Sequence, residues 1–428
     1  MTVNVITLGC SKNLVDSEHL LAQFRGSGFQ VMHNREDQLA DIVIINTCGF
    51  ILDAKEESVS TILYYADLKK EGRIRKLFVM GCLSERYKDE LIREIPEVDQ
   101  FFGVWDFDGI LHAAGTVYYP LLQTERFLST PAHYAYLKIS EGCNRHCSFC
   151  AIPGIRGPQQ SVSIDNLLTE SENLANQGVR ELILVAQDLT SYGTDLYRKH
   201  MLPQLLKELV NINGIEWIRL HYAYPTGFPE EVLDIMASEK KICRYLDIPV
   251  QHIADSVLNK MNRGHNREKL EGLLMRMREK IPGVAIRSTV MTGFPGETEK
   301  AYEELKSFIS SFRFDRLGVF AYSHEDGTPA GTQFRDRISQ KIKDERAAEL
   351  MAIQQEISLE LNTNKIGEEM TVIIDRIEKD HIIARSEFDS PEVDQEVLIK
   401  PGTSVAPGQF CQVRITGAEA FDLNAELI

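Results

Sequence analysis

The sequence predicts an α/β protein with three parts: an N-terminal open parallel α/β sheet, a central partial (βα)6 barrel and a small C-terminal antiparallel β-barrel. Three observations support this fold class. Short apolar runs alternate with helical patterns in the first third, further strand–helix units follow in the middle, and the end holds short strands between Gly and Pro turns. The first two patterns are typical of parallel sheets and the third of small barrels. We therefore expect domains at residues 1–120, 130–365 and 366–428.

The composition is that of an ordinary globular protein, with 428 residues, 43% hydrophobic and 26% charged. No apolar run approaches the ~20 residues that span a bilayer. The first eight residues alternate like a strand and resemble no signal peptide. We therefore expect a cytoplasmic protein whose eight cysteines serve metal binding or catalysis rather than disulfides. The net charge of −16 disfavours nucleic acid and favours a basic partner.

A three-cysteine loop is the most specific feature of the chain. Cys143, Cys147 and Cys150 stand at C-x3-C-x2-C spacing directly after a predicted strand. Thiolates suit zinc or iron–sulfur clusters, and both usually take four protein ligands. Because this loop supplies three, a cubane held here would keep one iron open. A zinc knuckle that uses His146 is less favoured, since its ring would have to fold back on the loop.

A second set of cysteines follows three predicted strands of the N-terminal part. These strands cover residues 3–8, 41–46 and 76–80, the cysteines are Cys10, Cys48 and Cys82, and helical patterns follow at 16–24, 53–68 and 84–95. Residues just past the ends of parallel strands gather along one edge of the sheet. We therefore expect the three thiolates to converge, helped by an adjacent glycine at each position. The alternative is that they are small buried core residues.

The middle of the chain alternates strands and helices six times. The predicted strands are residues 134–140, 181–186, 217–222, 245–250, 284–291 and 316–322, with helices that include 164–177, 202–210 and 299–312. Catalytic groups of such barrels stand on loops at the carboxyl ends of the strands. The residues that we expect to line a cofactor pocket are Phe149, Gln187, Arg219, Gln251 and Gly293. Arg219 could instead pair with a carboxylate in the barrel wall, and His252 could be structural.

A long charged helix at residues 339–364 leads to the C-terminal part, with predicted strands at 370–374, 381–384, 397–399 and 409–415. Barrels of this kind often bind RNA. Residues 366–428, however, hold five Lys and Arg against thirteen Asp and Glu, a net charge of −8. Such a barrel should steer a basic protein rather than RNA, unless it is only a solubilising surface. Cys243, at a predicted helix end, and Cys411, in a strand, are expected to be structural.

The chain as a whole resembles the radical S-adenosylmethionine (SAM) methylthiotransferases, whose final domain is called TRAM. The segments that carry the resemblance are residues 9–18, 141–153 and 247–252. They match best the branch that modifies an aspartate of small-subunit ribosomal protein twelve. The tRNA-modifying branch usually has a different stretch after the first cysteine and a more basic final domain.

The resemblance implies that Cys143, Cys147 and Cys150 are catalytic. They would hold a [4Fe–4S] cluster whose open iron binds SAM, and one-electron reduction would cleave SAM to a 5′-deoxyadenosyl radical. This radical would remove hydrogen from the β-carbon of the target aspartate.

The resemblance also implies that Cys10, Cys48 and Cys82 hold a second [4Fe–4S] cluster with an open iron. That iron would carry the sulfur of the methylthio group, and a second SAM would supply the methyl. The residue count agrees, because two sets of three ligands leave two open irons, one for each task.

The implied partners are a basic small-subunit ribosomal protein, docked by the acidic C-terminal domain, and an electron donor, with no membrane and no nucleic acid as the main substrate. Two alternatives remain at this point. One is methylthiolation of a tRNA adenosine, which the C-terminal barrel favours and its charge disfavours. The other is a non-catalytic iron–sulfur scaffold or electron carrier, which the polar strand-end loops disfavour.

Overall fold

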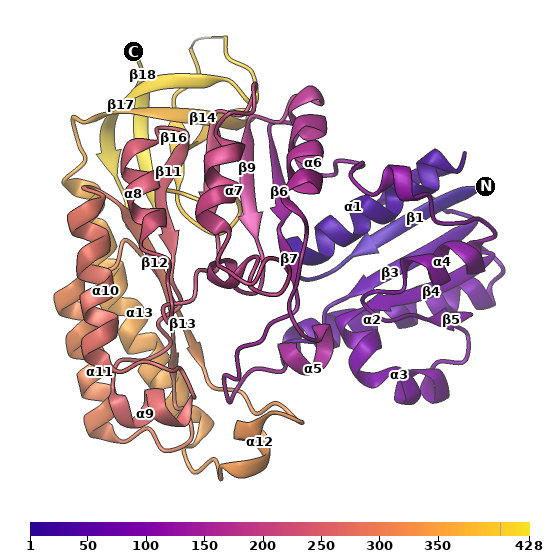
Figure 1. Ribbon diagram of the computed structural model, residues 1–428, viewed down its shortest axis with the longest axis horizontal. Helices are drawn as coiled ribbons and strands as arrows, with labels where there is room; N and C mark the ends of the chain where they lie inside the picture. The colour runs from indigo at the N-terminus through magenta and orange to yellow at the C-terminus, as the bar shows by residue number, and fades with distance from the viewer. Residues whose placement is uncertain (403) are drawn as a thin grey trace. The chain divides into compact units, whose positions relative to one another are not determined.

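A computed structural model describes residues 1–402 and 404–428 (Figure 1). The chain divides into two compact units. Unit 1 comprises Met1–Ser129, Tyr136–Arg145 and Cys150–Leu174, and unit 2 comprises Thr130–Ala135, His146–Phe149 and Ala175–Ile428. The three-cysteine loop therefore contributes residues to both units.

The sheet of unit 1 is parallel and has five strands in the order β2-β1-β3-β4-β5. Their bounds are β1 Thr2–Thr7, β2 Gln30–His33, β3 Ile42–Thr47, β4 Lys76–Gly81 and β5 Gln100–Phe101. The three predicted strands are confirmed as β1, β3 and β4. The edge strands β2 and β5 were not predicted, because with four and two residues they are too short to show a periodic pattern.

Helices cover both faces of this sheet. Helices α1 (Ser11–Gly26) and α4 (Phe107–Ala114) pack on the face that carries Ile42 and Ile44. Helices α2 (Leu52–Lys70) and α3 (Cys82–Glu94) pack on the face that carries Val43 and Ile45. Successive side chains of a strand point to opposite faces, so a fully buried strand such as β3, with the apolar run Ile42–Ile45, serves both layers.

Unit 1 also contains short elements around the three-cysteine loop. Strands β7 (Ser140–Glu141) and β8 (Gln160–Ser161) form a small antiparallel pair, and helix α5 (Ile152–Arg156) lies between them in the chain. The 3-10 turn η1 (Pro120–Leu122) also belongs to unit 1. Helix α6 (Ile164–Asn176) begins in this unit. Arg126 is buried and pairs with Glu18 of α1 and Glu170 of α6, which ties these helices together.

The second sheet has six strands in the order β13-β12-β11-β10-β9-β6, and β9 to β13 are parallel. The bounds are β6 Tyr134–Lys138, β9 Glu181–Val185, β10 Trp217–Leu220, β11 Ile242–Asp247, β12 Ala285–Thr292 and β13 Arg316–Ala321. The sheet is open, which confirms the predicted partial barrel. One detail was wrong: Cys243 lies inside β11, fully buried, and not at a helix end, because β11 starts three residues earlier than its apolar pattern suggested.

The remaining helices follow the strands of this sheet along the chain. They are η2 Leu189–Ser191, α7 Leu202–Leu209, α8 Glu231–Ser238, α9 Asp255–Lys260, α10 Arg267–Lys280, α11 Glu299–Phe312, α12 Pro329–Gln333 and α13 Gln340–Thr363. Thr298 caps α11 and Ser339 caps the predicted long helix α13, which packs on β12, β13 and α11. Over the described residues, none of the helices has both the length and the apolar content that a membrane span requires.

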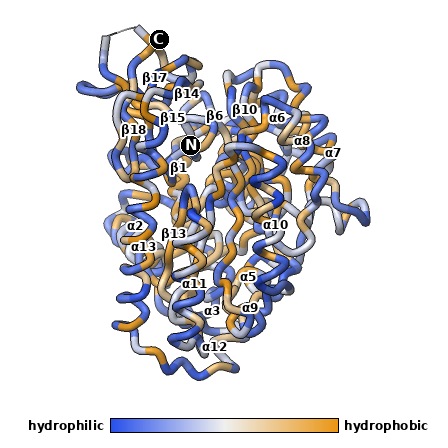
Figure 2. Tube along the Cα trace, turned by 90° about the vertical axis from the view of Figure 1, so that its left-hand side faces the viewer, coloured by the Kyte–Doolittle hydropathy of each residue, from blue (hydrophilic) through white to orange (hydrophobic). Residues whose placement is uncertain are grey.

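The C-terminal part is a closed barrel in the order β14-β15-β16-β18-β17. The strands are β14 Glu369–Ile377, β15 Ile382–Ser386, β16 Glu396–Ile399, β17 Phe410–Ala418 and β18 Asp422–Leu427. Strand β18 was not predicted, and it pairs in parallel with β16, so the barrel is not purely antiparallel. The interior of the barrel is aliphatic. In Figure 2 the hydrophobic residues of the chain are coloured orange.

This barrel packs against the amino ends of the strands of the six-stranded sheet. Trp217 and Cys243, near the starts of β10 and β11, join Ile373 of β14 in one apolar cluster. Phe410 of β17 meets the Trp217 ring edge-on at 4.9 Å. The carboxyl ends of the strands, where the candidate pocket residues were expected, lie at the other end of the same sheet.

Candidate metal centres

Three cysteines of unit 1 follow the carboxyl ends of adjacent strands. Cys10 is the N-cap residue of α1 after β1, Cys48 follows β3 directly, and Cys82 is the first residue of α3 after β4. Since β1, β3 and β4 are neighbours in the sheet, the three thiols share one edge. None lies inside a strand, so the packing of a strand interior does not account for their positions.

The loops that carry these cysteines are in close contact. Gly9 has φ +90°, and a Cβ added there would lie 2.6 Å from the Cβ of Cys48. A side chain at position 49 would also clash, because a Cβ added to Gly49 would lie 2.7 Å from the backbone nitrogen of Leu83, next to Cys82. The first contact joins the Cys10 and Cys48 loops and the second joins the Cys48 and Cys82 loops. The structure thus brings the three predicted positions together through backbone approach that only glycine permits.

The thiols of this edge have shifted pKa values. Burial raises the pKa of Cys82 to about 11, against the opposing charge of Arg156. Burial also raises the pKa of Cys48. At Cys10 burial acts in the same direction, but the charges of Lys12 and Arg156 and the backbone amides at the start of α1 outweigh it and lower the pKa. Nearby cations therefore favour the thiolate form that a metal requires at Cys10, whereas burial outweighs them at Cys48 and Cys82.

A buried arginine of α5 is the nearest cation to these thiols. The Nε–H of Arg156 donates to the Sγ of Cys82 over 3.3 Å, and its Nη1 reaches Glu141 at 2.6 Å and Asp16 at 3.2 Å. Its Nη2 donates to the side-chain oxygen of Asn13. Arg156 is 2% exposed. A charge buried this deeply needs all of these partners to offset its desolvation.

The middle of the three-cysteine loop belongs to unit 2 and has its contacts there. The Nη1–H of Arg263 donates to the Sγ of Cys147 over 3.3 Å, and the Tyr224 hydroxyl lies 3.6 Å from the same sulfur. Next to it, the backbone N–H of Ser148 donates to the carbonyl of Met261 over 3.0 Å. The segment after α9 therefore fixes the central cysteine of the loop.

The flanking cysteines of the loop belong to unit 1. Cys143 follows β7, and its backbone N–H donates to the carbonyl of Gly157 over 3.1 Å. Cys150 precedes α5, the helix that ends at Arg156. Cys143 is thus close to β7, which carries Glu141, a partner of Arg156. Cys150 is close to α5, which carries Arg156 itself.

Four of the candidate cofactor residues stand on unit 2 beside its strand ends. The Phe149 ring meets Phe294 edge-on at 6.4 Å, and Gln187 follows β9. Gln251 has φ +67° and bridges to Val290 of β12. Gly293 has φ +71°, and its N–H donates to Glu297 over 2.7 Å. The position of these residues agrees with the expected pocket wall, and their contact with SAM stays a prediction.

Two further residues have structural partners instead. The Arg219 guanidinium is fully buried and donates to Glu181 over 2.8 Å and to the carbonyl of Glu387 over 2.7 Å, at the amino ends of the strands. This is the wall-pairing alternative, and it argues against the proposed contact with the SAM carboxylate. His252 is fully buried, lies 3.2 Å from Glu297 and accepts from the N–H of Ala254, so its role is structural.

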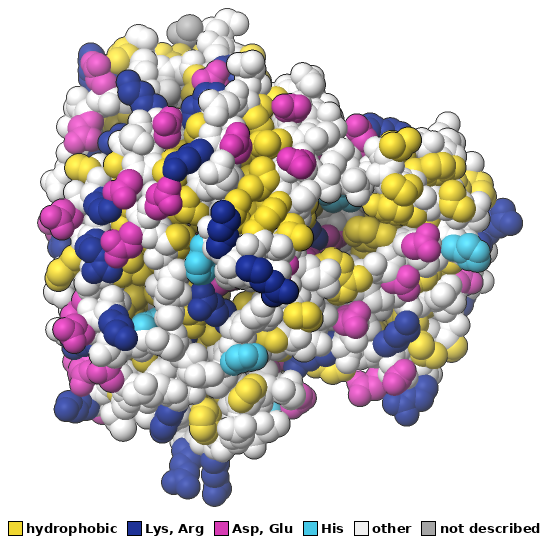
Figure 3. Space-filling view, in the orientation of Figure 1, with side chains coloured by type: hydrophobic (Ala, Val, Ile, Leu, Met, Phe, Trp, Pro, Cys, Tyr) yellow, Lys and Arg dark blue, Asp and Glu magenta, His cyan; other side chains and the backbone are white. Residues whose placement is uncertain are grey.

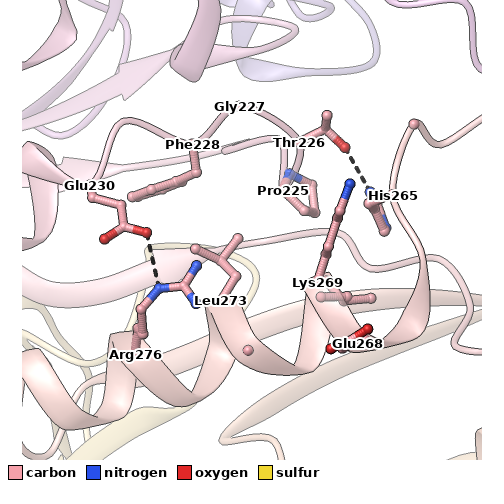
Figure 4. Close-up of a pocket in the computed structure, with 13 residues that line it drawn as sticks. Pro225, Thr226, Gly227, Phe228, Glu230, His265, Glu268, Lys269, Leu273 and Arg276 are labelled. Carbon is pink, nitrogen blue, oxygen red and sulfur yellow. Dashed lines mark hydrogen bonds and ion pairs between the residues drawn. The ribbon is translucent and has the colours of Figure 1, made fainter.

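A cavity of about 670 Å³ lies next to the Arg263 segment (Figure 4). Thr226 of its wall donates to the Arg263 carbonyl over 2.9 Å and bonds His265 at 2.8 Å. Burial lowers the pKa of His265 to about 4, so its ring is neutral at neutral pH. Arg276 pairs with Glu230 across the cavity. The walls carry both polar and apolar groups, as a binding pocket requires.

The donor set at the edge of the unit 1 sheet fits an iron–sulfur cluster. Over the described residues, no three His, Cys, Asp or Glu side chains are close enough to bind a single metal ion. A cubane distributes its cysteine ligands over different irons, so the sulfurs are spaced more widely than the ligands of one ion. Three thiols around a glycine-lined edge, with a buried cation beside them, match an anionic cluster better than a zinc ion.

Sequence reasoning missed Arg156 and Arg263, the two arginines that touch cysteine sulfurs. Their sequence signal was position alone: Arg156 follows Cys150 by six residues, and Arg263 is separated from Cys147 by more than a hundred. Arginines are frequent at the surface, and burial of these two follows only from tertiary packing. Proximity to the loop could have drawn attention to Arg156, but nothing in the sequence distinguishes Arg263.

Family comparisons cover most of the chain. Residues 2–103 match a family described as "Uncharacterized protein family UPF0004", residues 137–309 match the Radical SAM superfamily, and residues 366–428 match the TRAM domain. Solved structures agree at the level of the fold. The radical SAM methyltransferase TsrM from Kitasatospora setae has a TM-score of 0.57 at 15% identity and covers 77% of each chain. The radical enzyme OxsB has a TM-score of 0.52 at 12% identity, covering 83% of this chain and 56% of its own.

The six-stranded sheet with its three-cysteine loop defines a radical SAM enzyme, a class that uses SAM and iron–sulfur chemistry. Similarity to known proteins over the whole chain identifies the family within this class. The ribosomal protein uS12 methylthiotransferase RimO of Bacteroides fragilis is 52% identical over 428 residues, which is 100% of this chain and 99% of the relative. The RimO of Flavobacterium psychrophilum is 54% identical over 425 residues, which is 99% and 97%. The chain therefore belongs to the RimO family of radical SAM methylthiotransferases.

Proposed function

We propose that this enzyme methylthiolates the β-carbon of an aspartate in ribosomal protein uS12. The observation that carries the proposal is the gathering of Cys10, Cys48 and Cys82 at one sheet edge in a chain that also has the three-cysteine loop. One set of three cysteines would suffice for radical formation. A second set of three cysteines would serve to deliver the sulfur of the methylthio group. The relatives are named for uS12, which favours a protein substrate over a tRNA adenosine.

The proposal assigns two [4Fe–4S] clusters. Cys143, Cys147 and Cys150 hold one and are the catalytic ligands. A cluster held there would bind SAM and supply the radical chemistry that removes the β-hydrogen of the aspartate, and a second SAM would supply the methyl group. The other residues of this chain bind and orient: Phe149, Gln187, Gln251 and Gly293 are the proposed wall of the SAM pocket.

The second cluster is assigned to Cys10, Cys48 and Cys82. Their edge has no room for a side chain at Gly9 or Gly49, which supports close approach of the loops that carry the three cysteines. In the reaction one C–H bond breaks and one C–S bond forms on the substrate, with the hydrogen leaving on 5′-deoxyadenosine. The electrons would come from a one-electron donor of low potential, and the cluster held by Cys10, Cys48 and Cys82 would carry the sulfur to be transferred.

The division of labour follows the three sequence regions. We assign cluster binding for sulfur delivery to residues 1–120, radical formation to residues 130–365 and substrate docking to residues 366–428. A cytoplasmic location fits a ribosomal protein substrate, because ribosomal proteins meet their modifying enzymes there.

Docking of a basic protein by the C-terminal barrel needs acidic groups that are not already paired. Several are paired within unit 2: Asp375 with His133 and Arg385, Glu387 with Arg244, Asp389 with Arg316, and Asp394 with Arg287. The net charge of −8 therefore overstates the acidic surface. In Figure 3 acidic and basic side chains are mixed on the visible face. Among the described residues of this region, the exposed acids Glu368, Asp380 and Glu419 form neither an ion pair nor a side-chain hydrogen bond, and we assign docking to these.

The test is mass spectrometry of uS12 after incubation with reconstituted enzyme, SAM and a one-electron reductant. The expected result is replacement of one aspartate hydrogen by a methylthio group. The matched variant Cys10→Ala/Cys48→Ala/Cys82→Ala should still form 5′-deoxyadenosine and yield no methylthiolated product. Full methylthiolation by this variant would disprove the role of the second set. Methylthio product on tRNA and none on uS12, free or in the ribosomal subunit, would overturn the substrate.

A further inference from the structure

We infer that two buried arginines, Arg156 and Arg263, each donate a charge-assisted hydrogen bond to one cluster-ligating sulfur and thereby raise the reduction potential of that cluster. The inference rests on the proposed assignment of the six cysteines. It treats both arginines as positioning residues, since each acts on the cluster through a cysteine ligand.

The first arginine is fixed on all sides of its guanidinium. Its Nε–H points to Cys82, its Nη1 to Glu141 and Asp16, and its Nη2 to Asn13. Lys138 joins the same carboxylates, at 2.7 Å from Glu141. The donor is therefore preorganised, and its position does not depend on the presence of a cluster. Two carboxylates share the charge of Arg156, which reduces its electrostatic effect on the sulfur.

The second arginine lacks such carboxylates. Arg263 is 3% exposed, and its charge has no ion-pair partner in the part of the chain that the structure describes. Its other contacts are the carbonyl of Pro249 and the Tyr224 ring, 4.3 Å from the guanidinium carbon. The Nε of Arg263 is buried with no hydrogen-bond partner among the described residues.

A lone buried guanidinium is costly unless an anion lies beside it. Among the residues that the structure describes, the only anionic candidate in contact with Arg263 is the Cys147 sulfur, once it is a thiolate ligand of a cluster. The buried charge and the orphaned Nε both point to an anionic group at this place. An iron–sulfur cluster held by thiolates is such a group.

Hydrogen bonds to the sulfurs and local charge are two of the factors that set the potential of an iron–sulfur cluster. Reduction adds one negative charge, so a nearby cation stabilises the reduced state more than the oxidised state. Because the Arg156 charge is shared with two carboxylates and the Arg263 charge is not, removal of Arg263 should have the larger effect. This order is specific to the arrangement of charges in this protein.

The experiment isolates each cluster by removing the ligands of the other. The background Cys10→Ala/Cys48→Ala/Cys82→Ala retains the cluster beside Arg263, and Arg263→Gln and Arg263→Lys are made in it. Iron and sulfide content and the electron paramagnetic resonance signal of the reduced cluster are measured during a redox titration of the full chain. At the midpoint potential of the background, we expect Arg263→Gln to lower the ratio of reduced to oxidised cluster about tenfold, which is 59 mV for one electron. Arg263→Lys should lower it less.

The same titration applies to Arg156→Gln and Arg156→Lys in the background Cys143→Ala/Cys147→Ala/Cys150→Ala, with a smaller expected loss of about threefold. Matched controls remove an arginine that does not touch a sulfur: Arg267→Gln for the first background and Arg93→Gln for the second. Both controls should leave the ratio unchanged.

Several results would overturn the inference. An unchanged potential with full iron content in the glutamine variants would disprove tuning by hydrogen bonds. Loss of the cluster in both the glutamine and the lysine variants would assign the arginines a role in cluster assembly instead. A background that holds no cluster before any arginine is changed contradicts the assignment of the cysteines, and this outcome is distinct from the other two.

Discussion

Arg385 of strand β15 donates a hydrogen bond from Nη2 to the carboxylate of Glu181 on strand β9, over 2.7 Å. The other oxygen of Glu181 accepts from Arg219 over 2.8 Å, and neither Glu181 nor Arg219 is exposed. Arg385 extends the chain of charges to Asp375 at 2.6 Å, and Asp375 to His133 at 2.8 Å. The C-terminal barrel is thus attached to the six-stranded sheet by a buried ionic network as well as by apolar packing.

Replacement of Arg385 by Gln should destabilise the enzyme strongly. The change leaves the carboxylates of Glu181 and Asp375 buried with one partner fewer, and removal of one member of a buried ion pair costs about 3–5 kcal/mol. Denaturant unfolding of the reconstituted enzyme measures the change in free energy. The control is Arg376→Gln, which breaks exposed pairs with Glu378 and Glu396 and should cost about 0–1 kcal/mol. Equal losses in the two variants would show that the buried network contributes no more than a surface pair.

The same network predicts a pH dependence. Burial raises the pKa of Glu181, but Arg385 and Arg219 outweigh it and lower the pKa below its usual value. A carboxyl with a lowered pKa in the folded state contributes stability that is complete above its unfolded pKa of about 4.3 and is lost as the pH falls through the folded value. Asp375 has a lowered pKa too, through His133 and Arg385.

We therefore expect the free energy of unfolding to fall more steeply below about pH 4 in the wild type than in Glu181→Gln, which cannot titrate at this position. Unfolding curves recorded from pH 7 to pH 3 measure both slopes. The variant will be less stable at pH 7, so the slopes are compared and not the absolute values. Parallel curves for the two proteins would contradict the assignment of the low-pH loss to Glu181.

The sequence was sufficient where the pattern is periodic and buried. Strands β1, β3 and β4 and the position of Cys10, Cys48 and Cys82 behind them followed from apolar run lengths and the geometry of parallel sheets. Edge strands β2 and β5 did not, because a few half-buried residues carry no such pattern. The partners of single charged side chains could not be predicted from the sequence either. Arg219 could meet a ligand or the wall, and only the register of β9, β10 and the C-terminal barrel decides that it meets Glu181.

The acidic surface of the C-terminal barrel could not be predicted from the sequence either. A count of residues gives −8 but does not tell which acids face solvent. Asp389 is buried and bound to Arg316, and Asp394 bonds Tyr245 at 2.7 Å. Long-range pairs of this kind depend on how two domains pack, and no local pattern in the sequence records it.

Gly9→Ala should prevent assembly of the cluster assigned to unit 1. The new Cβ would lie 2.6 Å from the Cβ of Cys48, and φ +90° is unfavourable for alanine. Iron content after anaerobic reconstitution should fall by about half, since the cluster of the three-cysteine loop remains. The control is Gly28→Ala, which has φ +82° and no atom within 4 Å, so it shares the backbone strain without the steric clash. Full iron content in Gly9→Ala would show that the Cys10 and Cys48 loops can separate without loss of the site.

Arg219→Lys should affect stability and not cofactor binding. The guanidinium donates to Glu181 and to the carbonyls of Ser386 and Glu387, and lysine cannot reproduce this fork of donors. We expect a melting temperature lower by several degrees and a dissociation constant for SAM within about twofold of wild type. Isothermal titration at a temperature where the variant is folded measures the second value. A more than tenfold weaker SAM affinity at unchanged melting temperature would restore Arg219 as a cofactor contact.

The last prediction concerns docking of the basic substrate. Glu368, Asp380 and Glu419 are exposed acids of the C-terminal region, and none forms an ion pair. Their combined replacement by Lys should weaken binding of uS12 about tenfold at low salt, mainly through a slower association rate, because surface charges act by steering. The difference should shrink at 1 M salt, where the Debye length is about 3 Å. Surface plasmon resonance with uS12 over a salt series gives the rates.

The matched control for this variant carries the same change in charge elsewhere. Glu90, Glu94 and Glu239 are also exposed acids in no ion pair, and they lie on α3 and at the end of α8. Their replacement by Lys alters the net charge equally, so a general effect of net charge would slow association in both variants. An effect confined to the C-terminal variant would locate docking on the barrel. Equal slowing in the two variants would contradict a docking role for the barrel and leave net charge as the cause.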